Sequence, residues 1–403
     1  MFYLGIDIAR ASHCCCLLNN EGEQVGKTFD LPSSQNSFNA LIAKINTLKI
    51  DQGELLIGME ATGNLWENLY DFLNTKGFKV FLLNPFQTRK YRDLIGKKAK
   101  TDAIDSFVIA GLLRSGESTK SFVPDDQIQS LRDLVRLKNS LFETLKTYKR
   151  KAYALLNLIF PEYLTLVKNP FGVVSLAILK QFPSAKDVAG AKPRQILKIA
   201  RHFQGNNFDE ELAKRMISSA QSSIFSGRAN QARGLALRVM LSQIEQLQNH
   251  IEQIEQAVEE ILEPTEFSQS LGGNLLSIPG VGPKTVATLL AEVGDMQRFS
   301  SVKQLIGYVG LYPQISESGN SKKIPVLTKR GSPLLKHALY LAAVACVKHN
   351  PYLRKLYHQK VSQGKCAKQA LIVVARKLLC IFYSMLKYNT EFDPIRLNLA
   401  VAV

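Results

Sequence analysis

Tyr3-Leu4-Gly5-Ile6-Asp7-Ile8-Ala9 is the stretch that decides the fold of the first part of the chain. It is short and apolar, which is typical of a buried strand. Burying a carboxylate inside such a strand is costly unless the carboxylate is paired or binds a metal ion. Asp7 therefore predicts a functional site on the first strand, although an aspartate near a strand end is also commonly a turn or cap residue.

Strand and helix patterns alternate through the first 120 residues. Three strand-like segments in succession predict an antiparallel meander, and the strand–helix–strand units that follow predict a mixed sheet with helices. This order matches a ribonuclease-H-like fold. The expected elements are strands at 2–9, 13–20 and 24–30, a helix at 37–48, a strand at 54–59, a helix at 65–76 and a strand at 79–83.

Three further carboxylates follow elements of this predicted sheet. Glu60 comes directly after the predicted strand at 54–59. Asp102 and Asp105 lie three residues apart at the start of a predicted helix, so they share one face of it. Carboxylate oxygens are the ligands that hard divalent cations prefer, and such cations support phosphate chemistry. We expect the four acids to form one metal site, although Thr101-Asp102 alone also fits an ordinary helix N-cap.

The chain is strongly basic, with 51 Lys and Arg against 34 Asp and Glu, a formal net charge of +17 over 403 residues. Fourteen of the basic residues and no acidic one lie between Ser318 and Thr390. This favours a nucleic acid as partner over a membrane surface or a solubility device. Six cysteines without zinc-ligand spacing, and apolar stretches that are short or interrupted by Arg376 and Lys377, predict a cytoplasmic protein without a membrane span.

Residues 126–265 are predicted to be helical. Apolar residues from Leu237 to Ile261 follow alternating spacings of three and four, a heptad pattern over four repeats. An earlier helix has a similar pattern from Leu141 to Ile159. Either an intramolecular helical hairpin or self-association fits, and the oligomer number stays open. The outer face of the earlier helix is basic, with Arg132, Arg136, Lys138, Lys146, Lys149, Arg150 and Lys151.

The third part, residues 266–390, opens with a glycine-rich turn before a helix. Gly280 and Gly282 flank Val281, and Lys284 follows. This pattern is typical of a helix-hairpin-helix motif, whose amides face a phosphate of the DNA backbone. A helix-turn-helix corner without a ligand is the alternative. Loop residues further on, Lys322, Lys323, Lys329 and Arg330, are also expected to contact phosphates.

Motifs along nearly the whole chain, taken in order, resemble the transposases of the insertion-sequence-110 family, whose relatives include the pilin-gene invertases. The front part contains Gly-Ile-Asp at 5–7, Glu-Ala-Thr-Gly at 60–63 and Lys-Thr-Asp-Ala-Ile-Asp at 100–105. The later part contains Ile-Pro-Gly-Val-Gly-Pro at 278–283, Gly-Leu-Tyr-Pro at 310–313, Ser-Gly at 318–319 and Lys-Arg-Gly-Ser-Pro-Leu-Leu at 329–335.

The resemblance implies three domains: a RuvC-like DEDD catalytic domain at 1–125, a helical coiled-coil domain at 126–265 and a C-terminal transposase domain at 266–390. It implies that two magnesium ions are bound by four acids, Asp7, Glu60, Asp102 and Asp105. It also implies a serine nucleophile that forms a phosphoserine link to DNA. Ser318 is the best match, and Ser316 is the rival because the sequence reads Ser-Glu-Ser-Gly.

The implied function is that of a DNA transposase or recombinase, which cuts and rejoins strands to move an insertion sequence. Its implied partners are double-stranded donor and target DNA, a structured guide RNA encoded by the element, and further copies of the chain in a dimer or tetramer. The implied location is the prokaryotic cytoplasm, at the nucleoid when DNA is bound.

Two other functions fit the residues alone. One is a metal-dependent nuclease that resembles a Holliday-junction resolvase and forms no covalent intermediate. The other is a nucleic-acid-binding scaffold without catalysis. The long extension beyond the predicted sheet favours the recombinase over the resolvase, and the intact acids argue against the scaffold.

Overall fold

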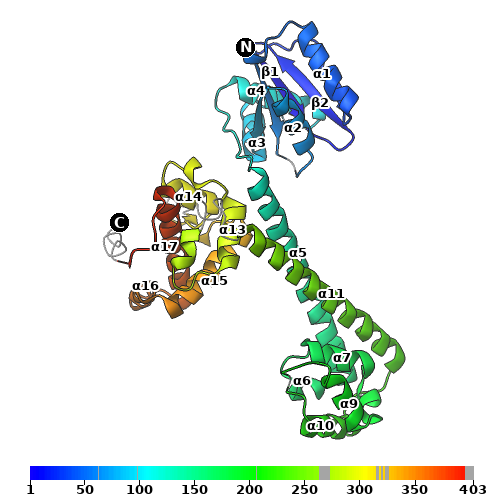
Figure 1. The fold of residues 1–403 in the computed structure, drawn as a ribbon. Coiled ribbons are helices and arrows are strands. Elements are labelled where there is room, and N and C mark those ends of the chain that lie inside the picture. The colour runs from blue at the N-terminus through cyan, green and yellow to red at the C-terminus, as the bar shows by residue number, and fades with distance from the viewer. Residues whose placement is uncertain are drawn as a thin grey trace. The chain divides into compact units, whose positions relative to one another are not determined.

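The computed structural model describes residues 1–61, 63–97, 99–205, 207–262, 273–314, 317–318, 321–322 and 326–394. The chain forms two compact units, Met1–Val123 and Pro124–Val403 (Figure 1). The first contains a five-stranded mixed sheet with helices, and the second is mainly helical. The predicted α/β part followed by an α part is therefore confirmed.

The sheet of the first unit has the strand order β3-β2-β1-β4-β5. Its first strand, β1 (Phe2–Asp7), runs antiparallel to β2 (Ser12–Leu18), which in turn pairs antiparallel with β3 (Phe29–Pro32). On its other side β1 runs parallel to β4 (Leu55–Glu60), which runs parallel to β5 (Lys79–Leu83). The first strand is thus central, with one neighbour of each direction.

The third strand lies later in the chain than predicted. Of the expected segment 24–30, Gln24 forms only an isolated bridge with Leu18, and the regular pairing begins at Phe29. Between them, Gly26 has a φ of +76°, which lies outside the extended region of the Ramachandran map. The chain therefore turns before it pairs with β2.

Helices cover both faces of this sheet. On one face, α1 (Gln35–Thr47) and α2 (Glu67–Thr75) form a hydrophobic core with the strands. On the other face, α4 (Asp102–Arg114) packs on β1, β2 and β4. A further helix, α3 (Pro85–Leu94), packs against α4 and was not expected from the sequence.

Two glycines allow α4 to lie directly on the strands. A Cβ atom on Gly5 would be 2.1 Å from the carbonyl oxygen of Ser106 and 2.5 Å from the nitrogen of Ala110. A Cβ atom on Gly58 would be 2.6 Å from a methyl carbon of Leu113. The two glycines are partners in the register of β1 and β4. A larger residue at Gly5 would push the helix away from the sheet, whereas one at Gly58 would first displace the Leu113 side chain.

The second unit is built on two long helices, α5 (Asp126–Ile159) and α11 (Asn230–Leu262), which pack along each other. Residues of the heptad pattern, among them Leu237 and Ile244, are fully buried in this unit. The intramolecular alternative of the sequence analysis is therefore present. The ends of both helices share a core with α6 (Tyr163–Leu166), α7 (Val173–Gln181), α8 (Ala185–Ala189), α9 (Pro193–Ala200) and α10 (Glu210–Gln221).

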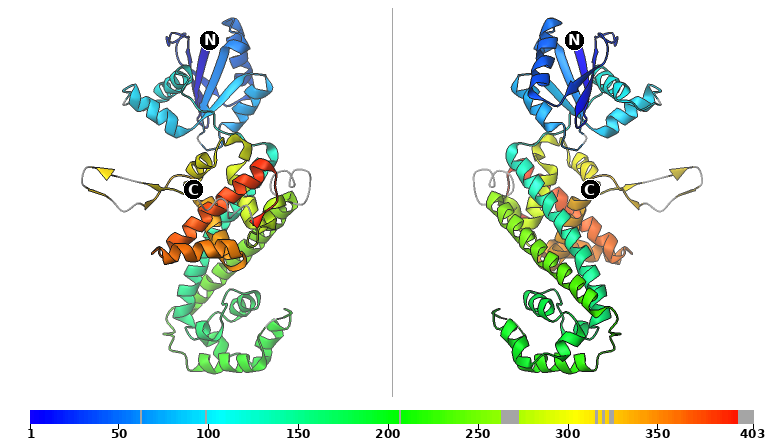
Figure 2. Two further views of the ribbon diagram at one scale, coloured as in Figure 1. Left: turned by 90° about the vertical axis from the view of Figure 1, so that its left-hand side faces the viewer. Right: turned by 90° about the vertical axis from the view of Figure 1, so that its right-hand side faces the viewer.

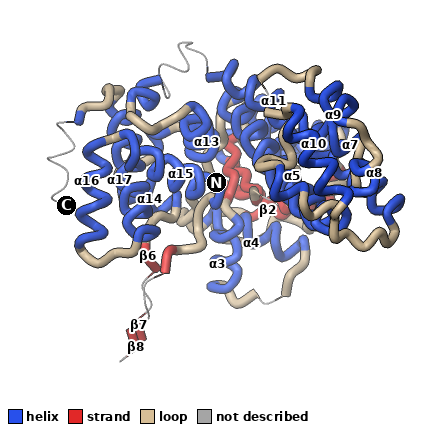
Figure 3. The backbone as a smooth tube through the Cα atoms, turned by 90° about the horizontal axis from the view of Figure 1, so that it is seen from below, coloured by secondary structure: helices blue, strands red, loops and turns tan. Residues whose placement is uncertain are grey.

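The opposite ends of α5 and α11 share a second core with the C-terminal helices. These are α13 (Pro283–Val293), α14 (Val302–Val309), α15 (Pro333–His349), α16 (Pro351–Ser362) and α17 (Ala367–Tyr388). Between α14 and α15 the chain forms two short antiparallel pairs, which extend away from the helices of this unit (Figures 2 and 3). One pair joins β6 (Pro313–Gln314) to β9 (Val326–Leu327), and the other joins β7 (Glu317–Ser318) to β8 (Ser321–Lys322).

Helix α17 was not expected to be a candidate membrane span, yet its length and composition alone would let it cross a membrane. Half of its most apolar 18-residue window is buried inside the unit. Val374, Leu378 and Phe382 are completely buried in the core that α17 shares with α13, α14 and α15. These contacts are those of a core helix.

Candidate active site and nucleic-acid interface

Two of the predicted acids are neighbours at the ends of adjacent parallel strands. Asp7 is the last residue of β1 and Glu60 the last of β4. The register pairs Gly5 with Gly58, so Asp7 and Glu60 occupy corresponding positions two residues later. Because side chains alternate between the faces of a strand, both acids lie on the face covered by α4.

The other two acids lie in the first turn of α4. The N-cap of this helix is Thr101, whose hydroxyl accepts a hydrogen bond from the Ile104 amide at 3.3 Å. Asp102 is exposed and is not needed as the cap, whereas Asp105 is half-buried. The close packing of α4 on Gly5 brings this turn towards the strand ends.

The four carboxylates interact electrostatically. The pKa of Asp7 is raised from 3.8 to about 6, first by burial and then by the negative charges of Asp105, Asp102 and Glu60, against a smaller lowering by Lys100. In the described part of the chain, no three Asp, Glu, His or Cys side chains are grouped closely enough to hold a metal ion. The structure thus brings the acids within range of one another's charge but not to ligand distance.

Two residues of α3, both missed by the sequence analysis, hold members of this cluster. The Thr88 hydroxyl donates a hydrogen bond of 2.6 Å to Glu60 Oε2. Arg92 Nη2 lies 2.5 Å from Asp105 Oδ1, and both side chains are largely buried, with 17% and 12% exposed. This is a charge contact without hydrogen-bond geometry, because Asp105 Oδ1 has no hydrogen-bond partner among the described residues.

The signal for α3 is present in the sequence. Asn84-Pro85 is an N-cap followed by proline at the first helical position, a common helix start. The Asn84 side chain accepts a hydrogen bond from the Phe86 amide at 2.9 Å. The predicted strand at 79–83 ends at the same dipeptide, which therefore both closes a strand and opens a helix.

The donor set fits a divalent metal ion. All four donors are carboxylates, the ligand type that Mg²⁺ prefers. Among the described residues, Asp105 Oδ1 is a buried oxygen without a hydrogen-bond partner, and Asp7 is destabilised as an anion by burial and by the neighbouring negative charges. A cation among these groups would relieve both costs, a task that Arg92 performs for Asp105 here.

The predicted nucleophile Ser318 belongs to the second unit. Its backbone lies in β7 and pairs with Ser321 of β8. Its rival Ser316 and the predicted phosphate contact Lys323 lie outside the described residues. The backbone of Lys322 is placed in β8. The structure therefore places Ser318 in a short strand pair and the four acids in the first unit.

The glycine-rich turn before α13 has a packing role. Gly280 has a φ of +94°, and a Cβ atom there would lie 2.7 Å from the backbone of Cys346 in α15. Gly282 is the N-cap of α13, and a Cβ atom on it would meet no described atom within 4 Å. The Lys284 ammonium donates a hydrogen bond of 2.6 Å to Glu255 of α11. Of the two glycines in this turn, Gly282 is thus the one at which a Cβ atom would have room.

The other predicted phosphate contacts differ in exposure. Lys329, Arg330, Arg150 and Lys151 are exposed, whereas Lys149 is half-buried and burial lowers the pKa of its ammonium group. Two arginines of the same basic face are already engaged at the C-terminal end of α13. Arg132 donates to the Ala291 carbonyl at 2.8 Å, and Arg136 pairs with Glu292 at 2.8 Å.

Comparison with known proteins identifies the class. A model of DEDD transposases of the IS110 type matches residues 4–161, which include the sheet, the four acids and α5. A second model, described as transposase IS116/IS110/IS902 family, matches residues 272–358, from α13 to α16. The protein is thus a DNA transposase, an enzyme that cuts and transfers DNA strands. The chain belongs to the IS110 family of transposases.

Full-length relatives support this membership. A 43.6 kDa protein of insertion element IS110 from Streptomyces coelicolor is 25% identical over 400 residues, which cover 97% of this chain and 95% of that protein. The pilin gene-inverting protein of Moraxella lacunata is 26% identical over 393 residues, with 97% of both chains covered. A mini-circle putative transposase for IS117, also from S. coelicolor, is 24% identical, with 98% of this chain and 96% of that protein covered.

Proposed function

We propose that this transposase moves an insertion sequence by cutting and rejoining DNA strands with two groups of residues. The first group is the carboxylate cluster Asp7, Glu60, Asp102 and Asp105, which binds Mg²⁺, in a RuvC-like sheet. The second is a serine nucleophile, Ser318. The observation that carries the first part is the raised pKa of Asp7, which is due first to burial and then to the negative charges of Asp105, Asp102 and Glu60. A cluster of unfavourable negative charge is what a cation site requires.

The residues around the cluster have distinct tasks in this proposal. Bound Mg²⁺ ions would supply positive charge to the phosphate that reacts. Thr88 fixes the orientation of the Glu60 carboxylate through its hydrogen bond. Arg92 holds Asp105 in the cluster and keeps a positive charge beside it. Asp7 is central and must be ionised to act as a ligand.

Serine chemistry accounts for rejoining without an outside energy source. The Ser318 oxygen would form a bond to phosphorus as the bond from phosphorus to a deoxyribose oxygen breaks, and the proton of the serine passes to that oxygen. The DNA end is then held as a phosphodiester to the protein. Attack by the hydroxyl of another DNA end reverses the step and releases the serine.

Basic residues of the second unit would bind the nucleic acids. We propose that Lys149, Arg150, Lys151, Lys322, Lys323, Lys329 and Arg330 contact phosphates of DNA and of a structured guide RNA. We also propose a helix-hairpin-helix contact at Gly282 and Lys284, and a dimer or tetramer of the chain. The charge of +17 and the exposure of Arg150, Lys151, Lys329 and Arg330 support these contacts.

The resolvase-like alternative is not favoured. Both matching family models are transposase models, and one of the relatives inverts a pilin gene according to its name. Such outcomes require that cut ends be rejoined to new partners, whereas hydrolysis by water leaves them free.

A strand-transfer assay tests the proposal. The purified protein is incubated with DNA that carries the ends of its own element, with Mg²⁺ or with a chelator. We expect rejoined strands only with Mg²⁺, and none with Asp7→Asn. Asp51→Asn is the matched control, because Asp51 is exposed in the same unit and makes no side-chain cap hydrogen bond. Full activity of Asp7→Asn would overturn the metal assignment.

A further inference from the structure

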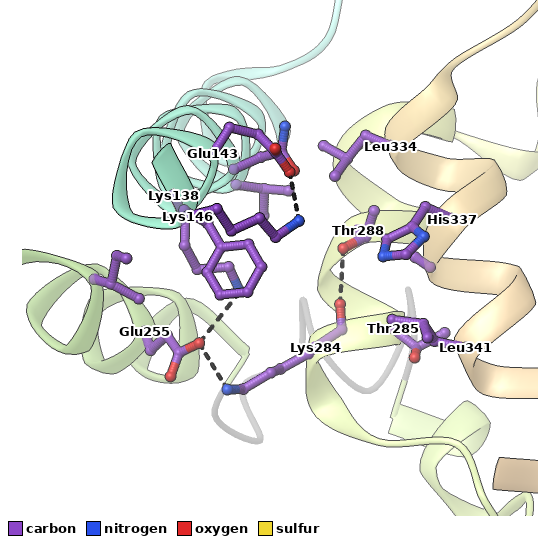
Figure 4. Close-up of a pocket in the computed structure, with 15 residues that line it drawn as sticks. Lys138, Glu143, Lys146, Glu255, Lys284, Thr285, Thr288, Leu334, His337 and Leu341 are labelled. Atoms are coloured by element: carbon purple, nitrogen blue, oxygen red, sulfur yellow. Dashed lines mark hydrogen bonds and ion pairs between the residues drawn. The ribbon is translucent and has the colours of Figure 1, made fainter. Parts of the chain in front are cut away.

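A cavity of about 280 Å³ lies within the second unit, between α5, α11, α13 and α15 (Figure 4). Of its lining residues, only Lys284 has a role in the function proposed above, as a phosphate contact. Its lining mixes apolar side chains with lysines, and Figure 4 shows Lys284 of α13 extending toward Glu255 of α11 and Thr285 of α13 lying beside Leu341 of α15. Ligand pockets have this combination of a mainly apolar lining with a few polar groups.

The charges at the cavity balance in favour of an anion. Lys284 and Lys138 share one carboxylate, Glu255, at 2.6 and 3.7 Å. A third lysine, Lys146, pairs with Glu143 at 2.7 Å. Three ammonium groups therefore face two carboxylates, which leaves one positive charge unbalanced within the lining. The long, partly exposed side chains of Lys146 and Lys284 can swing to a phosphate without unfolding anything.

An aromatic ring lines the same cavity. Phe142 of α5 is 46% exposed, which is high for a phenylalanine, and the ammonium of Lys146 lies 4.6 Å from its ring centroid. A partly exposed aromatic ring beside cations is a combination with which proteins bind unpaired bases, since a base can stack on the ring while lysines attract its phosphate.

The size and the position of the cavity limit what it can hold. Its volume is near the lower end of the range for small-ligand pockets, roughly 300–1,000 Å³. It suits one planar ring system with a neighbouring group, and it is too small for a helix. Lys284 and Thr285 lie in the first turn of α13, an 11-residue helix whose N-cap is Gly282. The positive end of that helix therefore borders the cavity and would favour a negatively charged group there.

We propose that this cavity binds one unpaired base of the DNA on which the transposase acts. The base stacks on Phe142, the amide of Asn139 and the hydroxyl of Thr285 are available to its polar edge, and the adjacent phosphates lie beside Lys146 and Lys284. The proposal rests on the function proposed above only for its DNA substrate, and it requires neither the metal cluster nor Ser318. Strand exchange leaves bases unpaired, and a pocket that stacks one of them offsets the free energy lost on unpairing.

The probe is a DNA duplex with one unpaired 5-iodouracil, compared with the same duplex in which that base is paired. Binding of the full-length chain is measured in chelator by fluorescence anisotropy, so that no strand is cut. We expect Phe142→Ala to weaken binding of the bulged duplex roughly five- to hundredfold, the range of one base–aromatic stack, and to leave the paired duplex unchanged. Tyr153→Ala is the matched control, because Tyr153 is an equally exposed aromatic residue of α5 outside the cavity.

Photocrosslinking of the same probe locates the base. The expected crosslink falls on Phe142 or His337, and competition with unlabelled bulged DNA removes it. Equal effects of Phe142→Ala and Tyr153→Ala, or a crosslink outside the lining, would overturn the proposal. A bulged RNA duplex that binds and crosslinks while the DNA does not would also overturn it, in favour of RNA. If the pocket fails while Asp7→Asn still abolishes strand transfer, the proposed function stands without it.

Discussion

The carbonyl oxygen of Ser106 in α4 lies 2.1 Å from the position that a Cβ atom on Gly5 of β1 would occupy. Helix and strand are therefore in backbone contact, two residues before Asp7 along the strand and one residue after Asp105 along the helix. Because Gly5 has no side chain, α4 packs closely enough on β1 to bring Asp102 and Asp105 towards Asp7 and Glu60.

Gly5→Ala should destabilise the first unit. The added methyl group cannot be accommodated without moving α4, because its nearest neighbours are backbone atoms. We expect a loss of about 3 kcal/mol in the free energy of unfolding, at the upper end for overpacking, together with a loss of metal binding. Chemical denaturation with and without Mg²⁺ measures both. Gly53→Ala should be neutral, because a Cβ atom there meets no described atom within 4 Å. Equal stability of the two variants would show that α4 can shift at little cost.

Neutralising Asp7 should stabilise the metal-free protein. The pKa of Asp7 is raised from 3.8 to about 6, mainly by burial. The folded state then holds this proton more tightly than the unfolded state, so stability is lost as pH rises from about 4 to about 6 and stays lost above. Asp7→Asn removes that loss. In chelator the variant should have a higher melting temperature than wild type at pH 7.5 but not at pH 3.5. With Mg²⁺ this difference in melting temperature should shrink or change sign. A variant with a lower melting temperature than wild type at pH 7.5 in chelator would contradict the conclusion that ionised Asp7 destabilises the folded state.

Replacing Arg92 should show that its positive charge stabilises Asp105 in the absence of a metal ion. Arg92→Gln leaves Asp105 largely buried without its partner, a cost on the order of 2 kcal/mol for a pair that keeps some contact with water. Mg²⁺ should then stabilise the variant more than it stabilises wild type, because the ion replaces the lost charge. Melting curves over a Mg²⁺ titration measure this. Arg89→Gln, an exposed change on the same helix, serves as control. Identical Mg²⁺ responses in all three proteins would remove Arg92 from the site.

Covalent trapping tests the serine. Strand cleavage through Ser318 should leave protein attached to a DNA end, which survives denaturation and shifts the DNA band on a gel. Ser318→Ala should abolish this adduct, because the variant lacks the hydroxyl that would bond to phosphorus, and a melting curve checks that the variant folds. An adduct that persists in Ser318→Ala but is lost in Ser316→Ala would identify the other serine. Cleavage in Mg²⁺ without any adduct would show that strands are cut at the carboxylate cluster without a serine nucleophile.

RNA binding should depend on salt through the basic face of α5. The purified protein is expected to carry an RNA of discrete size from its own locus. Arg150→Gln with Lys151→Gln should weaken binding of that RNA and reduce the slope of log K against log salt by about 2, one unit for each phosphate that the variant no longer neutralises. Lys214→Gln is the control, because Lys214 is exposed on α10 and already pairs with Glu210. A preparation free of RNA, with binding and strand transfer unaffected by added locus RNA, would rule out the guide.

Local patterns predicted most elements of the fold. The strand at 79–83 was predicted with the observed bounds, and α4 and α11 follow apolar patterns that the sequence shows directly. The third strand was misplaced, because its start depends on the positive φ of Gly26, which composition alone does not reveal. The sequence also did not determine which helix packs against the heptad pattern of α11. The same apolar stripe can pack against another copy of the chain or against another helix of the same chain.

The candidate site was predicted only in its acids. Carboxylates at strand ends and at a helix start stand out in a sequence, whereas the groups that hold them come from elsewhere. Arg92 and Thr88 reach Asp105 and Glu60 because α3 folds back on α4, a tertiary contact that no spacing encodes. Lys284 was likewise chosen for its place beside the glycines, and its pairing with Glu255 of α11 followed only from packing.

The lengths of α5 and α11 set the separation of the two cores at the ends of this helix pair. The first family model ends at residue 161, and the second begins at residue 272. Neither of them therefore covers α6 to α10 or any part of α11. Seven residues added to each long helix would carry that small helical cap roughly 10 Å further out and return nearly the same faces to contact. Three added residues would instead rotate the cap around the pair. Insertions of seven residues in each helix would therefore change the length of this helical pair while both cores at its ends stay as they are.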